Sequence, residues 1–191
     1  MRSFFLSIFA LAISMSLFAA NIIPDSKDIK IAGSTVIWKA SKVTGTHDGN
    51  VKFKGGSLTF EGDILIGGDL IVDMTTVEVT DLSGGGKAKL EGHLKSDDFF
   101  GVTNHPTAKI KFTKVTPRGI TGEYRVTANI TIKNITKEIK FNATLKDGVA
   151  NTSIKLDRSD FDIRYGSGSF FDNLGDKTIF DEFDLNITVA Y

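Results

Sequence analysis

The chain of 191 residues has no cysteine, only one tryptophan and three prolines, and no excess of either charge. Without cysteine it can form neither a disulfide framework nor a lipid-modified cysteine anchor. Its 23 basic and 23 acidic residues cancel, which argues against nucleic acid or an anionic lipid surface as an electrostatic partner. No long apolar run follows residue 20, so the sequence predicts no membrane-spanning helix and no stable membrane insertion there.

The one long apolar run lies at the N-terminus. Met1 and Arg2 form a short basic start, the segment from Phe4 to Phe18 carries no charge, and small residues follow at Ala19 and Ala20. This is the layout of a secretory signal peptide, and the run is too short for a confident membrane span. We therefore predict a signal peptide over residues 1–20 and one exported, periplasmic domain over residues 21–191. The mature chain would carry 22 basic and 23 acidic residues.

Alternation of apolar and polar residues dominates the mature chain. Between Ile120 and Ile132 every second residue is apolar or small, while most of the residues between them are polar. The same alternation returns from Ile139 to Leu145 and from Ile179 to Tyr191. A period of two residues predicts strands with one dry face and one wet face.

Glycine-containing turn signals separate these runs, as expected of successive antiparallel hairpins. They are Asp48-Gly49, Gly55-Gly56, Gly67-Gly68, Pro117 to Gly119 and Asp147-Gly148. Only residues 87–96 have a helical pattern. The alternating runs therefore predict an all-β fold. Because closing a sheet on itself buries its apolar face and removes its exposed edges, we predict a closed antiparallel β-barrel of about eight strands with one short helical segment. Periodicity does not distinguish a filled barrel from a hollow one.

Six stretches form a further pattern, in this order: Val43 to Gly49, Val72 to Met74, Leu90 to Phe100, His105-Pro106, Ala128 to Lys137 and Asp157 to Gly166. Together they resemble the YceI-like family of exported, lipocalin-like, polyisoprenoid-binding proteins. The resemblance covers nearly all of the mature chain. Asn134 stands where the family often has glycine, and asparagine can also adopt a positive φ.

The resemblance implies an elongated barrel with a helical segment near Leu90 to Phe100 and a long internal tunnel. It also implies a binding protein without catalytic residues or cofactor. The partner would be a long apolar chain, such as a polyisoprenoid, an isoprenoid quinone or a fatty-acid-like amphiphile. Candidate tunnel-lining residues lie on the dry faces of the strands and in the last motif: Trp38, Phe53, Phe112, Tyr124, Val126, Ile130, Phe141, Phe161, Ile163, Phe183 and Leu185.

Two phenylalanine pairs stand outside the alternating runs, each beside aspartate. Phe99-Phe100 and Phe170-Phe171 could form the mouth of a tunnel or a contact between the subunits of a homodimer. The other interpretation is a plug that closes one end of the barrel core.

Residues with catalytic or metal-binding chemistry form no recognisable motif. His47, His93 and His105 share no zinc-ligand spacing, which predicts no metal site. Glycoside hydrolysis requires a pair of carboxylates, and candidates are Asp157, Asp160, Asp162, Asp172 and Asp176. Acidic residues are, however, common in turns. Gly166-Ser167-Gly168 precedes no helical pattern, so we interpret it as a flexible loop rather than a phosphate site. Hydrolase activity is therefore a less favoured hypothesis than lipid binding.

A small outer-membrane β-barrel is the main alternative. The alternating C-terminal run from Phe183 to Tyr191 is typical of such barrels, in which the apolar face points outward. Aromatic girdles at both membrane interfaces are also expected, whereas the chain has one tryptophan and three tyrosines. We therefore favour an inward apolar face.

Overall fold

A computed structural model describes residues 23–191, and the predicted signal peptide lies outside the described residues. Strands dominate, and the elements follow in the order β1 Asp25–Asp28, β2 Lys30–Lys42, β3 Gly45–Glu61, β4 Ile64–Val79, α1 Gly84–Lys95, β5 Thr107–Pro117, β6 Glu123–Ile132, β7 Ile135–Lys146, β8 Val149–Asp157, the 3-10 turns η1 Arg158–Phe161 and η2 Gly175–Lys177, and β9 Ile179–Ala190.

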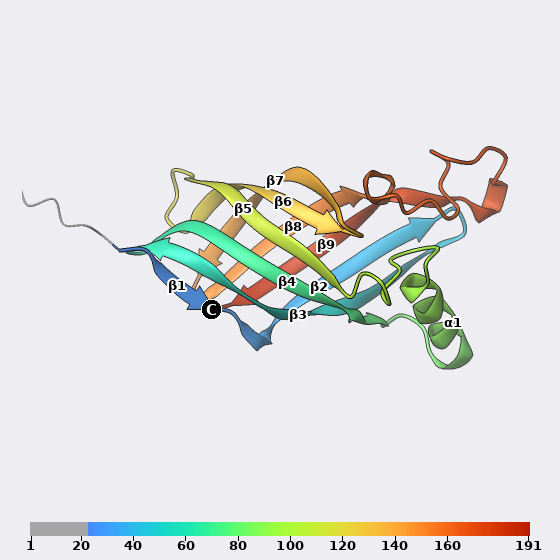
Figure 1. Cartoon of the computed structure of the whole chain (residues 1–191), viewed down its shortest axis with the longest axis horizontal. Helices are drawn as coiled ribbons and strands as arrows, with labels where there is room; N and C mark the ends of the chain where they lie inside the picture. Colours follow the sequence, from blue (N-terminus) through green and yellow to red (C-terminus); the bar gives the residue numbers. More distant parts are fainter. Residues whose placement is uncertain (1–22) are drawn as a thin grey trace, which may run out of the picture.

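The strands form a closed antiparallel barrel (Figure 1). Neighbouring strands follow the order β3-β2-β9-β8-β7-β6-β5-β4, and β4 pairs with β3 to complete the ring. β1 continues the course of β2 along β3, since Asp25 pairs with Phe60 while Val36 pairs with Val51. The barrel therefore has eight strand positions, and the predicted fold class is confirmed.

The dry face of each alternating run points into the barrel. In β6, Tyr124, Val126, Ala128 and Ile130 are buried, and the intervening Arg125 is exposed. The start of this run was predicted wrongly, because Ile120 is 65% exposed and belongs to a turn. Gly122 ends that turn with a φ of 84°, a left-handed conformation that a continuing strand does not adopt.

Three of the predicted glycine turns are wrong. Gly49 and the pair Gly55-Gly56 lie inside β3, and Gly67-Gly68 lies inside β4. A Cβ at Gly49 would overlap the carbonyl oxygen of Glu78 and the indole of Trp38. Within long barrel strands, such glycines allow close approach and bending. By contrast, the chain does turn directly after Pro117, which ends β5, and at Asp147-Gly148.

The hairpin between β6 and β7 confirms the expectation for Asn134. Lys133 and Asn134 have φ values of 49° and 63°. A two-residue loop with both residues at positive φ is typical of a type I′ turn, whose twist matches that of the flanking strands. Asn134 therefore adopts a backbone conformation that usually favours glycine.

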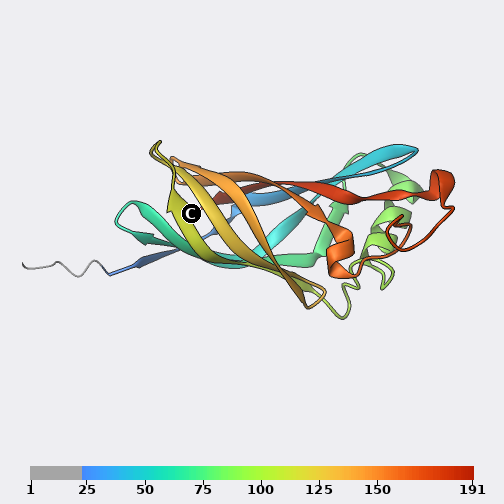
Figure 2. The same cartoon turned by 90° about the horizontal axis from the view of Figure 1, so that it is seen from above.

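The one α-helix among residues 23–191 caps one end of the barrel. α1 begins at Gly84, earlier than the predicted Lys87, and ends at Lys95, so Phe99 and Phe100 lie in the turns that follow it. Glu91 accepts a hydrogen bond from the backbone N–H of Val79 at 2.9 Å, and Lys87 donates one to Glu78 at 2.7 Å. These contacts attach α1 to the end of β4. α1 and the segment before β9 share this end of the barrel (Figure 2).

Among the neighbouring strands of the barrel wall, β7 and β8 share the shortest stretch of backbone pairing. These strands pair only from Ala143 opposite Thr152 to Lys146 opposite Val149, whereas β6 pairs with β7 along almost its whole length. Beyond Ala143, β7 has no backbone pairing with β8. A side-chain ion pair crosses the gap there, with Lys137 of β7 lying 2.9 Å from Asp160 of η1. We call the unpaired part, residues 135–142 against residues 153–157, the seam.

We expect the seam to exchange its amide hydrogens faster than the rest of the wall. About half of the β7 amides from 135 to 142 point away from β6 and have no strand to bond, so they should lose protection first. Hydrogen-exchange mass spectrometry would compare this peptide with residues 123–132 of β6, which are paired on both sides. Equal protection of the two peptides would contradict the assignment of a seam.

Candidate functional site

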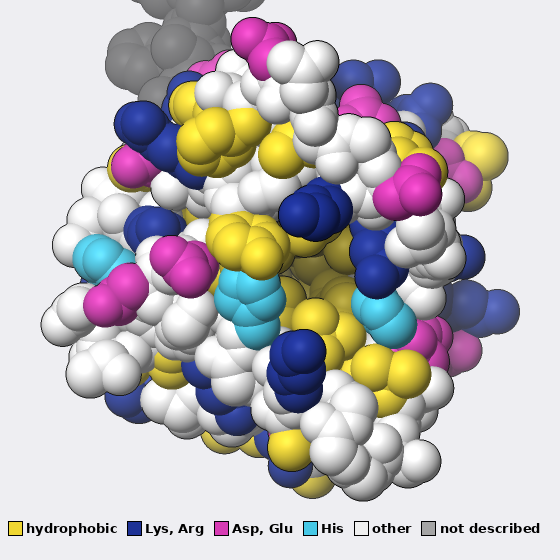
Figure 3. Space-filling view, turned by 90° about the vertical axis from the view of Figure 1, so that its right-hand side faces the viewer, with side chains coloured by type: hydrophobic (Ala, Val, Ile, Leu, Met, Phe, Trp, Pro, Cys, Tyr) yellow, Lys and Arg dark blue, Asp and Glu magenta, His cyan; other side chains and the backbone are white. Residues whose placement is uncertain are grey.

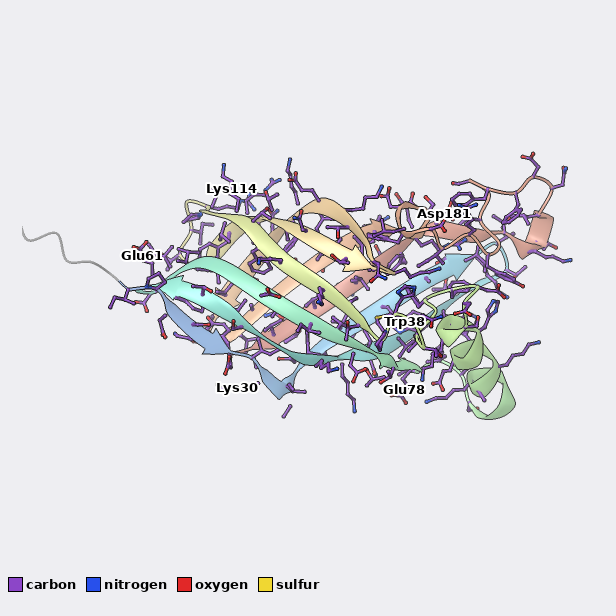
Figure 4. The ribbon with its side chains drawn as sticks, in the orientation of Figure 1. Lys30, Trp38, Glu61, Glu78, Lys114 and Asp181 are labelled. Carbon is purple, nitrogen blue, oxygen red and sulfur yellow. The ribbon has the colours of Figure 1, made fainter. Side chains whose placement is uncertain are left out.

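Large side chains fill the barrel at the end far from α1. Phe60 and Tyr191 lie with ring centroids 5.2 Å apart, and the Tyr124 hydroxyl accepts a hydrogen bond from the backbone of Leu65 at 3.2 Å. Leu58 and Leu65 are almost completely buried among them. Glu61, at the tip of the β3–β4 hairpin, marks this end in Figure 4, whereas Trp38 lies near α1. The barrel is therefore plugged on one side only.

The other end of the barrel is hollow. A cavity of about 120 Å³ lies there. Figure 3 looks onto this end and shows an opening with hydrophobic side chains inside it and basic and histidine side chains around it. The wall is apolar except for one arginine, and its residues are Val36, Trp38, Ala40, Val51, Val72, Met74, Val77, Leu94, Phe99, Phe100, Ala108, Ile110, Ile130, Ile132, Arg158, Ile163, Ile179, Phe180, Phe183, Leu185 and Ile187.

A second hollow of about 30 Å³ continues toward the plugged end. Phe112 and Phe141 form part of its wall, with ring centroids 6.0 Å apart. Both hollows border on Ile110 and Ile187. A chain longer than the main cavity would therefore have to pass these two side chains.

The structure distributes the predicted tunnel-lining residues over three environments. The main cavity is bordered by Trp38, Ile130, Ile163, Phe183 and Leu185. The smaller hollow is bordered by Phe112 and Phe141. The packed core, away from both hollows, contains Phe53, Tyr124, Val126 and Phe161. Phe99 and Phe100 border the main cavity, whereas Phe170 and Phe171 are 40% and 50% exposed.

Sequence reasoning missed the small residues that leave the cavity open. Ala40 and Ala108 face the main cavity, and Leu94 of α1 covers it. The dry-face alternation could have identified Ala108 as inward-facing. It could not show that alanine at this position leaves empty space, because that depends on the side chains opposite it.

Arg158 is the charged residue of the cavity wall, and it is only 4% exposed. Four of its five N–H groups donate hydrogen bonds to the carbonyl oxygens of Phe180, Ile163, Tyr165 and Ile179. The guanidinium also forms an ion pair with the carboxylate of Asp181. Burial lowers the pKa of the Arg158 guanidinium, while the carboxylates of Asp181 and Asp157 act in the opposite direction. Arginine nevertheless stays charged in proteins. Arg158 therefore ties the segment before β9 to the barrel instead of offering a free cation to a ligand.

Asp181 was not identified as important from the sequence, although it anchors the same segment. One carboxylate oxygen lies 3.0 Å from Arg158, and the other accepts hydrogen bonds from the hydroxyls of Ser167 and Ser169 at 2.8 and 2.6 Å. Ser167 is completely buried. Gly166-Ser167-Gly168 is therefore an anchored turn, and its interpretation as a flexible loop is wrong.

Three of the five acidic residues considered for hydrolysis have structural contacts outside the cavity. Asp157 accepts hydrogen bonds from the backbone and hydroxyl of Ser159, and so begins η1. Asp160 contacts Lys137, and Asp162 accepts a hydrogen bond from Arg164. Among the described residues, no carboxylate borders the main cavity.

The three histidines lie in separate surroundings. His47 forms a 2.8 Å contact with Asp81, whereas His93 packs edge-on against Phe99 and Tyr165 with centroid distances of 5.0 and 4.3 Å. Over residues 23–191, no group of three or more histidine, cysteine or acidic side chains is placed to hold a metal ion. In the same residues, no helix is long and apolar enough to cross a membrane.

Comparison with known proteins supplies the wider context. A family model described as the YceI-like domain matches residues 25–191. A UPF0312 protein of Pectobacterium carotovorum subsp. carotovorum is 38% identical over 58 residues, which cover 30% of this chain and only 29% of that protein.

Solved structures share the fold at low identity. BcnA of Burkholderia cenocepacia gives a TM-score of 0.68 at 18% identity, covering 85% of this chain and 99% of that one. A polyisoprenoid-binding domain of Saccharophagus degradans, implicated in plant cell wall breakdown, gives a TM-score of 0.55 at 14% identity. That match covers 85% of this chain and 97% of the other.

Proposed function

Because this chain belongs to the YceI-like family, we propose that it is a binding protein that holds a long apolar lipid in its barrel. The observation that supports this most directly is a cavity with an almost entirely apolar wall that opens at one end of the barrel (Figure 3). A polyisoprenoid, an isoprenoid quinone or a fatty-acid-like amphiphile has the required chemistry. The polyisoprenoid-binding neighbour supports the first of these.

The driving force would be burial of the chain. Each methylene removed from water contributes about 0.8 kcal/mol, from which the cost of ordering the ligand must be subtracted. The one charged group in the wall, Arg158, donates four hydrogen bonds to backbone carbonyls and is paired with Asp181. We therefore expect affinity to depend more on the length of the apolar chain than on its head group.

Binding without catalysis fits the surroundings of the cavity better than hydrolysis does. Hydrolysis of a glycosidic bond needs two carboxyl groups facing the substrate. None of the acids that motivated that alternative borders the main cavity, and Asp157 instead caps η1. We infer that the protein carries or stores its ligand unchanged.

Export is the second part of the proposal, and Arg2 followed by the run from Phe4 to Phe18 supports it. The alternative of an outer-membrane barrel requires an apolar outer band. Here the outward-facing residues of β6 include Arg125, Thr127, Asn129 and Thr131, while the apolar face is inside. This arrangement favours the periplasm over insertion in the outer membrane.

One experiment addresses both parts. The full chain would be produced in a Gram-negative host, isolated from the periplasmic fraction and measured by native mass spectrometry before and after organic extraction. We expect an N-terminus near residue 21 and an added mass that extraction removes. Protein without added mass, and without uptake of the C45 prenol solanesol on incubation, would contradict lipid binding. Recovery only from washed outer membranes with detergent would contradict the proposed location.

A further inference from the structure

Exposed aromatic side chains are confined to one segment of the described chain. Tyr165, Phe170, Phe171 and Phe180 are 40–50% exposed, and all lie between residues 165 and 180. The other large hydrophobic residues exposed in residues 23–191 are aliphatic, such as Ile64 in β4 and Ile120 in a turn. Single exposed aliphatic residues need no explanation, but a cluster of exposed aromatic residues marks an interaction surface.

This segment borders the opening of the cavity. Phe180 is both half-exposed and part of the cavity wall. The backbone N–H of Val43 donates to the carbonyl of Thr178 at 3.1 Å, so the exposed Val43 extends the surface onto the β2–β3 turn. The segment lies at the end that Figure 3 faces, on the same side as α1 (Figures 1 and 2). We call Val43, Tyr165, Phe170, Phe171 and Phe180 the aromatic rim.

The rim is held in place by the protein. The backbone N–H groups of Phe170 and Phe171 both donate to the carbonyl of Ser167, at 3.2 and 3.1 Å. Ser167 is itself buried and bonded to Asp181. The guanidinium of Arg164 lies 4.9 Å from the Phe170 ring centroid. The exposure of these rings is therefore maintained by a specific set of contacts.

Charge indicates which kind of partner the rim fits. Residues 164–180 carry Arg164 and Lys177 against Asp172 and Asp176, so they have no net charge. Basic and histidine side chains surround the opening itself (Figure 3), but the segment that carries the exposed rings adds no net charge of its own. Aromatic side chains on such an uncharged segment are typical of residues that sit at the interface between water and a lipid bilayer.

We propose that the aromatic rim docks the open end of the barrel onto the surface of a lipid bilayer. Insertion of the rings among the lipid head groups would place the cavity opening against the membrane. A long apolar lipid could then pass between membrane and cavity with little exposure to water. The role in lipid transfer depends on the proposed function, whereas the docking itself does not.

Flotation with phosphatidylcholine vesicles tests the docking. We expect the purified chain without its signal peptide to float with the vesicles, and F170S/F171S to lower the partition coefficient at least about tenfold. The matched control is I64S/I66S, which removes two exposed aliphatic side chains at the plugged end and should behave as the wild type. Raising the salt from 0.1 M to 0.5 M should change partitioning by less than about twofold, because attraction between charges is not the cause.

Three results would overturn the proposal: no flotation of the wild type, equal loss in both double variants, or binding restricted to anionic vesicles at low salt. Sedimentation velocity tests the alternative that the rim binds a second copy of the chain. A dimer that F170S/F171S converts to a monomer, without vesicle binding, would assign the rim to self-association. Native mass spectrometry of the same samples separates the two hypotheses, since bound lipid in a protein that does not float leaves the proposed function standing.

Discussion

Replacing Arg158 with methionine is expected to lower the free energy of unfolding by about 3–5 kcal/mol. The substitution leaves the Asp181 carboxylate, whose side chain is only 15% exposed, without its cation. It also removes the donors to four carbonyl oxygens in the segments around η1 and before β9. Unpaired polar groups inside a protein cost more than the hydrogen bonds are worth on balance. Urea denaturation followed by circular dichroism would measure the loss.

Arg164→Met is the matched control. Arg164 is an exposed arginine in the same region, and its loss should change stability by no more than about 0.5 kcal/mol. If Arg158→Met does not fold, Arg158→Lys keeps the charge but has three donors instead of five, and a loss of about 2 kcal/mol is expected. A loss below about 1 kcal/mol in either Arg158 variant would contradict the anchoring role.

Replacing Ala108 with phenylalanine is expected to weaken lipid binding about 50-fold while the barrel stays folded. Ala108 is buried, lies on β5 opposite Val72, and faces the main cavity. A phenyl ring there would occupy the space of about three methylenes of the ligand, which corresponds to about 2.4 kcal/mol. Trp38, the only tryptophan, borders the same cavity, so its fluorescence can report titration with a prenol.

The control places the same ring outside the barrel. Lys109→Phe changes the neighbouring, outward-facing residue and should retain wild-type affinity. Lipid loss from both variants would contradict the assignment of the inner face. Global unfolding of Ala108→Phe alone would indicate a filled core, because overpacking of a tight interior costs about 1–3 kcal/mol. The protein would then have no open cavity next to residue 108.

The wrong turn predictions have a common cause. Glycine marks a turn in an isolated hairpin, but it also occurs where a long strand bends or another chain segment approaches closely. Gly56 illustrates the second case, because a Cβ there would overlap the carbonyl oxygen of Asp69 on β4. Sequence alone does not show which strand lies beside a glycine. The glycine turn signals therefore predict shorter strands than the β3 and β4 of the structure.

The sequence by itself determined the type of fold and the direction in which side chains point. Alternation in runs such as Tyr124 to Ile132 depends only on the pleat of a strand, and an all-β chain with one apolar face has few ways to bury it. The ordered motifs then indicated the family. None of this required knowing which strands are neighbours.

Only the tertiary structure decided where the barrel is hollow and what holds its open end. Whether inward residues fill the space depends on which side chains meet across the barrel. Phe60 meets Tyr191 at one end, whereas Ala40 and Ala108 leave room at the other. The contact between Arg158 and Asp181 likewise joins η1 to β9, two segments that alternation treats separately. Periodicity specifies the face on which a residue lies, while the packing opposite it is set by strand register and closure.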